Sequence, residues 1–291
     1  MSIRKILVTG ANGQLGWEIA QAAPSFPLFE FVFVDRTKLD LSKPESFQAI
    51  IKEIGPDAII NTAAYTAVDK AEIEKELAYT INVLAVQELA TICKQLAIPF
   101  ITYSTDYVFN GNATSPYLTD MPVDPVNYYG TTKAAGEQMV MAANEESIII
   151  RTSWVFSAHG NNFVKTMLRL MKERASLSIV GDQQGRPTYA KDLANATIQI
   201  VISINEGRKI KGIFHYANTG ATTWFGFAEK IKALAGLKCE LTAINTIDFP
   251  TPAKRPAYSI LDTKKIESEL SISIPNWETA LAACITQIGI V

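Results

Sequence analysis

The hydrophobic and polar positions in the first half of the chain fall into two alternating patterns. Short apolar runs predict strands, and longer stretches in which apolar residues recur every three or four positions predict helices. The predicted strands are 3–9, 29–35, 58–61, 99–105 and 147–155, and the predicted helices are 13–23, 44–54, 71–96 (with a break near 76–77) and 128–143. Because strands alternate with helices, we expect an α/β fold with a doubly wound, mostly parallel sheet that is covered on both faces.

The second half of the chain is less regular. Helical patterns cover 162–173, 190–204, 224–235, 263–270 and 276–287, and apolar runs at 177–180 and 212–217 predict two further strands. Glycine and proline gather at 181–187 and 250–256, which indicates loops. We interpret these loops as facing a cleft between a larger domain (1–160 with 189–218) and a smaller α/β cap (161–188 with 219–291).

Composition narrows the class of protein. Of the 291 residues, 48% are hydrophobic and 19% are charged, which excludes a mainly disordered chain because such chains are poor in apolar residues. The 27 Lys and Arg against 29 Asp and Glu give a net charge of −2, without the basic excess of nucleic-acid or membrane-surface proteins. No apolar run reaches the roughly 18 residues that a membrane span needs.

The start of the chain runs directly into a predicted strand without a signal-peptide pattern, so we expect a cytoplasmic protein. Cys93, Cys239 and Cys284 stand far apart, which excludes a disulfide framework or a zinc site and fits a reducing compartment. The only histidines are His159 and His215, which we interpret as structural. We therefore predict no metal.

Three glycines follow the first predicted strand and open the first predicted helix. Gly10, Gly13 and Gly16 have the spacing GxxGxxG, whereas most dinucleotide folds have GxGxxG. Glycine permits a tight turn and close backbone approach, and the helix N-terminus offers free N–H groups to a pyrophosphate. The alternative is a plain strand-to-helix turn, but the strand before and the helix after favour dinucleotide binding in a Rossmann-like domain.

An acid at the end of the second predicted strand fits the same interpretation. Asp35 lies 19 residues after Gly16, where a carboxylate bonds the adenosine ribose in dinucleotide folds. Arg36 is next to it and suits the 2′-phosphate of NADPH. The alternative is a solvated Asp-Arg turn. The pair predicts that the cofactor is NADPH or NADH, without strong discrimination.

Tyr129 and Lys133 have a YxxxK spacing at the start of a predicted helix. Residues four apart share a helical face, so the phenol and the ammonium can point into one cleft. A nearby cation lowers the pKa of a phenol, which would make Tyr129 a proton donor that is tunable near neutral pH. The alternative is an ordinary exposed pair. Tyr128 is a poorer candidate because no lysine follows it at that spacing.

Polar residues also end two predicted strands, where ligands bind in open parallel sheets. Ser104 and Thr105 offer hydroxyls to a substrate carbonyl, or else cap the next turn. The small residues in 61–65 would let a cofactor pass closely. Asn82, on a predicted helix, is a buried hydrogen-bonding residue or a site residue.

These motifs together resemble the extended short-chain dehydrogenases/reductases, and among them the dTDP-4-dehydrorhamnose reductases. The stretches that carry the resemblance are VTGANGQLGWE at 8–18, AAYTAVDKAE at 63–72, YSTDYVFNG at 103–111, NYYGTTKAAGE at 127–137, RTSW at 151–154, GDQQGRPT at 181–188 and RPAYS at 255–259. They run nearly from end to end of the chain. The resemblance implies that NADH or NADPH reduces the 4-keto group of dTDP-4-dehydro-L-rhamnose to give dTDP-L-rhamnose.

The resemblance also implies roles for individual residues. The implied contacts are Gly13, Gln14 and Leu15 with the cofactor phosphates, Asp35, Asp40 and Leu41 with the adenosine, Ala63, Ala64, Tyr65 and Tyr103 with the nicotinamide side, Thr105, Asp106, Tyr129 and Lys133 with the sugar, and Trp154 with the pyranose. Arg186 would bind the nucleotide diphosphate. Without the resemblance, Trp154 would be a core residue and Arg186 a surface loop charge.

The chain departs from the family at one place. Some members bind magnesium through two acids, and here Glu18 is present but Lys191 stands where we expect the second acid.

Two rival functions remain. One is a nucleotide-sugar epimerase or dehydratase of the same fold, which usually carries a Ser-Ser-x-x-Val-Tyr-Gly type segment instead of Ser-Thr-Asp-Tyr-Val-Phe. The other is a non-catalytic regulatory subunit. The partners expected are a nucleotide sugar and a second copy of the chain in a homodimer.

Overall fold

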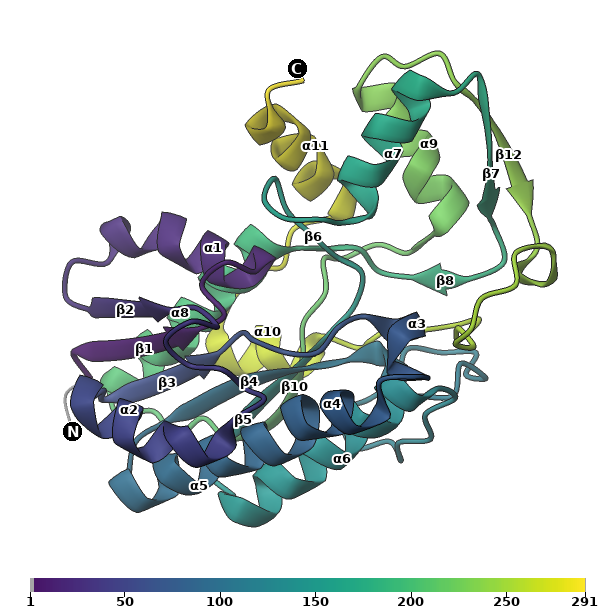
Figure 1. Cartoon of the computed structure of the whole chain (residues 1–291). Helices are drawn as coiled ribbons and strands as arrows, with labels where there is room; N and C mark the ends of the chain where they lie inside the picture. Colours follow the sequence, from purple (N-terminus) through teal and green to yellow (C-terminus); the bar gives the residue numbers. More distant parts are fainter. Residues whose placement is uncertain (1–2, 291) are drawn as a thin grey trace.

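A six-stranded parallel sheet forms the centre of the larger part of the molecule (Figure 1). The computed structural model describes residues 3–290. The strands lie in the order β2-β1-β3-β4-β5-β10, and every pairing between them is parallel. Their bounds are β1 Lys5–Thr9, β2 Glu30–Val34, β3 Ala58–Asn61, β4 Phe100–Thr105, β5 Ile148–Thr152 and β10 Gly212–His215. The predicted parallel sheet is confirmed.

Helices cover both faces of this sheet (Figure 1). One face carries α1 Gln14–Ala22, α8 Ala190–Asn205 and α10 Lys264–Leu270, and the other carries α2 Phe47–Ile54, α4 Lys75–Tyr79, α5 Ala85–Leu96 and α6 Tyr128–Ala143. Successive strand residues point to opposite faces, so Leu7 packs into one hydrophobic cluster while Ile6 and Val8 pack into the other. Apolar strands that are buried on both sides are therefore the reason that the sheet is doubly wound.

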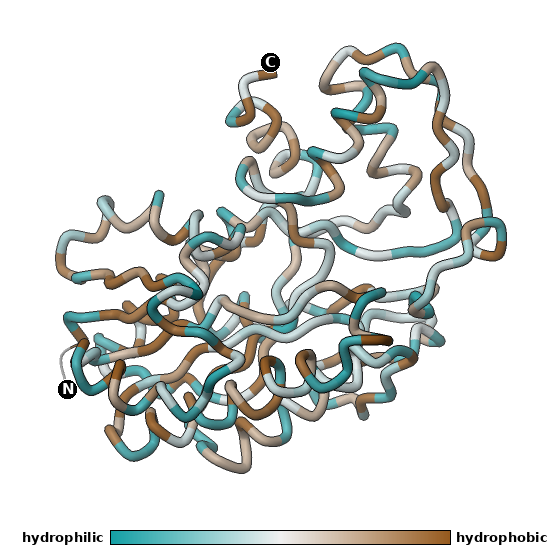
Figure 2. The backbone as a smooth tube through the Cα atoms, viewed as in Figure 1, coloured by the Kyte–Doolittle hydropathy of each residue, from teal (hydrophilic) through white to brown (hydrophobic). Residues whose placement is uncertain are grey.

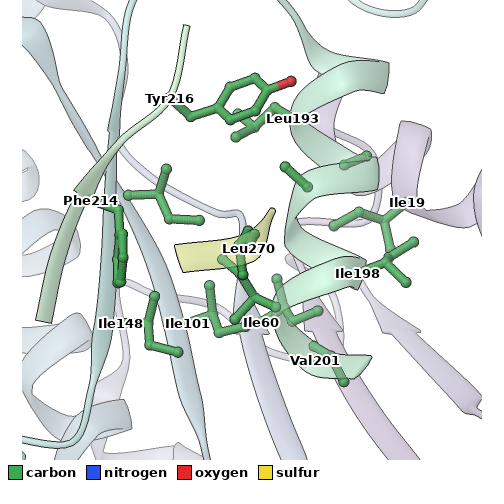
Figure 3. Packing of buried hydrophobic residues seen from close by; sticks show 14 of the residues in the cluster. Ile19, Ile60, Ile101, Ile148, Leu193, Ile198, Val201, Phe214, Tyr216 and Leu270 are labelled. Carbon is green, nitrogen blue, oxygen red and sulfur yellow. The ribbon is translucent and has the colours of Figure 1, made fainter. Parts of the chain in front are cut away.

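Figure 3 shows the cluster between the sheet and α8. Ile60, Ile101 and Ile148 project from neighbouring strands toward Ile19 of α1 and Ile198 of α8. All five side chains are buried. This packing holds α1 and α8 against the sheet.

The long helix predicted over 71–96 is divided differently from our expectation. The break lies at residues 72–74, between the short helix α3 (Val68–Ala71) and α4, and not at 76–77. A π-turn at Thr80–Leu84 then joins α4 to α5. Such turns widen a helix locally and often accompany functional sites.

The smaller part of the molecule has its own core (Figure 1). Its elements are α7 Phe163–Glu173, α9 Trp224–Leu234, α11 Trp277–Ile288 and a parallel strand pair, β7 Ser176–Val180 with β12 Glu240–Ile244. The hydropathy colouring of Figure 2 shows apolar stretches along these helices and both strands. Our prediction missed β12, because its mostly exposed residues form no continuous apolar run.

Short elements connect the two parts. They are β6 Val155–Phe156, β8 Gln184–Gly185, β9 Thr188–Tyr189, β11 Thr222–Thr223 and the 3₁₀ turns Ala23–Ser25, Pro44–Ser46, Asp106–Val108 and Thr246–Asp248. The division into domains stays a prediction, with one exception. Ile266 and Leu270 of α10 pack into the core of the large sheet, although the prediction assigned them to the cap. No helix within residues 3–290 is both long enough and apolar enough to cross a membrane.

Candidate active site

A cavity of about 890 Å³ opens at the carboxyl ends of the strands in the large sheet. The strand order reverses between β1 and β3, and ligands bind at such a switch point in open α/β sheets. The cavity is lined by all the predicted site residues except Gly16 and Arg186, namely Gly10, Gly13, Gln14, Leu15, Asp35, Arg36, Asp40, Leu41, Ala63, Ala64, Tyr65, Tyr103, Thr105, Asp106, Tyr129, Lys133 and Trp154. The structure thus brings these residues together, while their individual roles stay predictions.

The glycine loop forms one end of the cavity and leaves no space for side chains. A Cβ atom on Gly10 would lie 2.8 Å from the backbone nitrogen of Ala63, and one on Gly16 would lie 2.3 Å from the carbonyl oxygen of Gly10. Gly10 also has a φ of +72°, which favours glycine. Gly16 therefore acts by packing beneath the loop, since it does not line the cavity.

The start of α1 fits the pyrophosphate of a dinucleotide. Gly13 is the N-cap residue and no side chain caps the helix there, so the first N–H groups of α1 face the cavity without a side-chain partner. Free N–H groups and the helix dipole together favour an anion. The residues present in this loop therefore suit NADPH or NADH.

The two residues expected at the adenosine differ in how firmly they are held. Asp35 accepts hydrogen bonds from the Thr37 hydroxyl (2.6 Å) and amide (2.9 Å), and from Asn12 (3.1 Å). The Thr37 hydroxyl and amide hold the pKa of Asp35 below its usual value, so this carboxylate is ionised at neutral pH. Arg36 is 76% exposed, with Nε 3.4 Å from Asp40 Oδ1, and is free to turn toward a 2′-phosphate.

Tyr129 and Lys133 lie on the buried face of the first turns of α6. Asn127 caps this helix by accepting a hydrogen bond from the Gly130 amide at 2.8 Å. Burial raises the pKa of Tyr129, the Thr105 hydroxyl opposes the shift, and the Asp106 charge adds to it. Tyr129 is therefore protonated at neutral pH, as a proton donor must be. Our prediction that Lys133 lowers this pKa is wrong, because burial raises it and the charge of Lys133 is not among the influences that act on it.

The Lys133 ammonium donates a hydrogen bond to the carbonyl oxygen of Tyr103 at 2.7 Å. Burial lowers the pKa of Lys133 to about 8, and the negative charge of Glu137 acts against that shift. Glu137 is itself buried and accepts two hydrogen bonds from Arg151, at 2.9 and 2.7 Å. Lys133 thus stays mainly cationic at pH 7, with a buried ion pair one helical turn away.

Thr105 and Asp106 form the polar wall next to Tyr129. The Thr105 hydroxyl donates to Asp106 Oδ1 at 3.0 Å and accepts from the Tyr107 amide at 3.2 Å. Burial raises the pKa of Asp106 to about 6, and its Oδ2 has no hydrogen-bond partner among the described residues. Buried polar atoms are normally paired, so this oxygen fits a donor from a ligand, such as a sugar hydroxyl.

Trp154 faces the cavity from a strained position. The strand predicted over 147–155 ends at Thr152, and Trp154 has a φ of +47°. Such a conformation costs energy in a bulky residue and is concentrated at functional sites. Its ring stacks on Trp224 with centroids 3.6 Å apart, and a Cβ on Gly185 would lie 2.5 Å from it. Our prediction missed Trp224, which comes from α9 in the smaller part and carries no motif.

Arg186 does not reach the cavity wall, contrary to the prediction of a phosphate contact. Its guanidinium donates a hydrogen bond to the carbonyl oxygen of Leu261 at 2.9 Å, and its own carbonyl oxygen accepts one from Ser153 at 2.7 Å. Burial lowers the pKa of Arg186. These contacts make it a structural tie between neighbouring segments.

Asn82 joins the loop after β3 to α6. Its side chain accepts from the Tyr65 amide and donates to the Tyr65 carbonyl and to the Thr132 hydroxyl, each at 3.0 Å. It is almost fully buried. The sequence left open whether Asn82 belongs to the site, and these contacts make it a clamp that holds the cavity loop against α6.

The family's magnesium ligands do not fit a site within residues 3–290. Burial raises the pKa of Glu18. The hydrogen bond from Ser157 (2.6 Å) and the charge of Lys191 act in the opposite direction. No group of three acidic, histidine or cysteine side chains in this part of the chain is arranged to hold a metal. We derive no step through a metal, and its absence stays a prediction.

Comparisons with known proteins agree on one family. The family described as the RmlD substrate binding domain matches residues 4–290. A dTDP-4-dehydrorhamnose reductase of Burkholderia thailandensis is 40% identical over an alignment of 293 positions that covers 97% of this chain and 98% of the relative.

Solved structures give the same result. A dTDP-4-dehydrorhamnose reductase of Clostridium acetobutylicum has a TM-score of 0.92 and 38% identity, with 98% of this chain and 99% of that chain covered. One of Bacillus anthracis in complex with NADP has a TM-score of 0.91 and 37% identity, with 99% and 100% covered. A UDP-glucose 4-epimerase of Thermus thermophilus in complex with NAD has a TM-score of 0.82 over 98% of this chain and 99% of that one, but only 17% identity. That likeness shows the fold alone.

Proposed function

The chain belongs to the family of the RmlD substrate binding domain, and we propose that it reduces the 4-keto group of dTDP-4-dehydro-L-rhamnose to give dTDP-L-rhamnose, with NADPH or NADH as the reductant. Relatives named dTDP-4-dehydrorhamnose reductase support this function over nearly the whole chain. The observation that carries the proposal is that Tyr129 and Thr105 line the same cavity as the glycine loop. A carbonyl reduction needs a proton donor and a dinucleotide cradle side by side.

The glycine loop and the strand ends next to it hold the cofactor in this proposal. The amides of Gln14 and Leu15 bind the pyrophosphate next to Gly13, whose own amide donates to the Gly10 carbonyl. Asp35 accepts from the adenosine ribose, and Arg36 accommodates a 2′-phosphate. When bound, the reduced nicotinamide supplies a hydride to the carbonyl carbon. The other residues of this side are Gly10, Gly16, Asp40, Leu41, Ala63, Ala64, Tyr65 and Tyr103.

The proton comes from Tyr129. Negative charge develops on the carbonyl oxygen during the reduction, and a donor that is already in place stabilises it. The protonated phenol of Tyr129 is one such donor, and the Thr105 hydroxyl becomes the second when its O–H turns from Asp106 to the substrate oxygen. The cationic side chain of Lys133 holds the ribose on the nicotinamide side.

The sugar is held from both sides of the cavity. The unpaired oxygen of Asp106 accepts from a sugar hydroxyl, and the exposed part of the Trp154 ring contacts the pyranose. Trp224 supports that ring from the smaller part, so substrate binding draws on both parts of the molecule.

The two rival functions are less well supported. The structural likeness to an epimerase reflects the fold alone, at 17% identity. A regulatory subunit has no need for a buried, protonated tyrosine beside a polar wall in a dinucleotide cavity. We retain the reductase as the function that the site supports best.

The proposal includes a cytoplasmic location and a homodimer. The three cysteines are buried and unpaired in the part of the chain that the structure describes, which suits a reducing compartment. Light scattering of the purified protein measures the oligomeric state. A monomer at working concentration would contradict the homodimer without affecting the reductase.

The direct test is turnover with the purified wild-type protein. NADPH or NADH is mixed with dTDP-4-dehydro-L-rhamnose, and nicotinamide absorbance and the sugar product are followed together. We expect one cofactor oxidised for each dTDP-L-rhamnose formed, and no oxidation when the sugar is omitted. Cofactor binding without any oxidation in the presence of the keto sugar would overturn the proposal.

A further inference from the structure

A segment that approaches from the smaller part lies across the elements that hold Tyr129. We call residues 250–257 the strap; it is the yellow-green segment close to α3 in Figure 1. The carbonyl oxygen of Lys254 accepts a hydrogen bond at 2.8 Å from Asn127, the residue that caps α6. Pro256 packs so closely against Gly111 that a Cβ atom on Gly111 would lie 2.7 Å from the proline ring. The strap therefore rests on both the start of α6 and the loop after β4.

An ion pair between the half-buried Arg255 and the more exposed Asp69 connects the strap to α3. The Arg255 guanidinium bonds both carboxylate oxygens of Asp69, with Nη2 2.7 Å from Oδ2. The Ala253 amide donates to the same carboxylate at 3.1 Å, and the Ala253 carbonyl accepts from Arg255 at 2.6 Å. Asp69 thus ties together both the side chain and the backbone of the strap. Bidentate geometry of this kind fixes orientation as well as distance.

The ion pair lies directly behind the cavity wall. Val68 and Lys70, on either side of Asp69 in α3, both line the cavity. Asp69 itself is turned toward the strap and Arg255, and neither member of the pair lines the cavity. The pair therefore acts on the shape of the wall without contacting a ligand there.

Arg255 also reaches the catalytic tyrosine through one intervening ring. Tyr107 lines the cavity and packs edge-on against Tyr129, with ring centroids 5.9 Å apart and planes at 76°. Burial raises the pKa of Tyr107, the Asp106 charge adds to this, and Arg255 opposes it. Arg255 thus acts electrostatically on the ring that packs against Tyr129.

We propose that Arg255 and Asp69 are positioning residues whose ion pair latches the strap and thereby sets the place of Tyr129 against the keto sugar. This inference rests on the proposed function. It deepens that function by assigning a catalytic consequence to a contact between the two parts of the chain. A misplacement of about 1 Å at the reacting atoms is enough to cost on the order of a hundredfold in rate.

The test compares charge removal at the latch with charge removal at a distant ion pair. Asp69→Asn keeps the shape of the side chain and an acceptor for the Ala253 amide, while Arg255→Gln removes the other charge. The matched control is Glu146→Gln, which breaks the exposed Lys211–Glu146 pair far from the cavity. Each variant and the double variant are assayed for kcat and KM with the keto sugar, for NADPH affinity and for Tm.

We expect kcat/KM for the keto sugar to fall about tenfold to a hundredfold in Asp69→Asn and in Arg255→Gln. NADPH affinity and Tm should stay close to those of the control variant. Because the two residues act as one unit, the double variant should lose no more than the worse single variant. Amide hydrogen exchange within 250–257 should also be faster in both latch variants than in the control.

The outcomes separate the latch from the function. If the wild type turns over the keto sugar and the latch variants match Glu146→Gln in kcat/KM, the latch proposal is wrong and the reductase stands. If kcat/KM falls only in proportion to a lost Tm or a lost NADPH affinity, the pair is structural and the proposal is again wrong. If the wild type does not turn over the sugar, the proposed function fails, and the positioning role fails with it.

Discussion

The two walls of the cavity are built in different ways. The sheet-side wall consists of the glycine loop, the end of β4 and the start of α6, so each side chain is placed by the end of one regular element. The cap-side wall depends on contacts between distant segments, such as the stack of Trp154 on Trp224 and the ion pair of Asp69 with Arg255. This difference teaches that regular elements carry the reacting groups, whereas their placement against the sugar also depends on side-chain contacts between the parts.

The sharpest test of this contrast removes the proton donor from the sheet-side wall. Tyr129→Phe keeps the ring and its edge-on contact with Tyr107 but loses the acid. General acid catalysis is worth about 10²–10⁴ in rate, so kcat should fall by that factor while NADPH binding survives. Steady-state kinetics and calorimetry measure the two quantities.

Tyr128→Phe is the matched control for that variant. Tyr128 precedes Tyr129 on α6 but does not line the cavity, and its ring lies under the ammonium of Lys75. We expect near-normal kcat. The reverse pattern, with kcat lost in Tyr128→Phe and kept in Tyr129→Phe, would contradict the account of the sheet-side wall.

The ion pair behind Lys133 should matter more for stability than any pair on the cap side. Glu137→Gln leaves the buried guanidinium of Arg151 without its anionic partner, and breaking a buried pair in this way costs about 3–5 kcal/mol. Glu146→Gln breaks an exposed pair and should cost about 1 kcal/mol or less. Urea unfolding of the two variants gives both values, and equal costs would show that Glu137 is not essential to the core.

The amino-acid pattern alone predicted the sheet-side wall well. The glycine loop and the YxxxK pair lie within single strand-to-helix units, where local spacing determines which side chains share a face. The raised pKa of Tyr129 was missed because burial depends on the whole fold and not on the spacing to Lys133. Local pattern thus predicts which groups meet but not the dielectric around them.

The cap-side wall was predicted less well for a related reason. Trp224, the strap and β12 acquire their places only from contacts across long stretches of chain. Arg186 was expected at a phosphate because its loop resembles the family's, yet its guanidinium bonds the Leu261 carbonyl. The residue type and its position in a loop do not determine which of several nearby acceptors the guanidinium will hydrogen-bond.

Lys133 gives the sheet-side wall a defined pH dependence. Its pKa is lowered to about 8, so the ammonium loses its charge as pH rises through that value. Above pH 8, kcat/KM should fall by about tenfold for each pH unit, because only the cationic form carries the charge and the full set of donors that hold the cofactor ribose. A pH profile that stays flat to pH 10 would exclude this role for Lys133.

A smaller effect is expected from the aromatic stack of the cap-side wall. Trp224→Ala removes the ring that supports Trp154, and such pairs are worth about 0.5–1.5 kcal/mol beyond their buried area. KM for the keto sugar should rise by roughly threefold to tenfold, with kcat and NADPH affinity nearly unchanged. A large loss of kcat would mean that the stack also positions the reacting carbonyl, which would blur the contrast between the walls.

The smallest effect is expected at the rim of the cofactor site. Arg36 is mostly exposed, and exposed charge pairs contribute about 1 kcal/mol or less. Arg36→Ala should weaken NADPH binding by about fivefold or less and leave NADH binding unchanged. A wild-type preference above roughly a thousandfold for either cofactor, which is about 4 kcal/mol, would show that Asp35 or Arg36 does not serve both.

The central claim is that this cavity carries out a net reduction of a sugar carbonyl, and isotope transfer tests it most directly. Wild-type protein is given NADPH deuterated at the transferred position of nicotinamide C4, together with dTDP-4-dehydro-L-rhamnose. The account predicts one deuterium per product molecule, located at C4 of the sugar, and one oxidised cofactor for each label transferred. A sugar product without deuterium at C4, or label retained on the cofactor through many turnovers, would contradict the account.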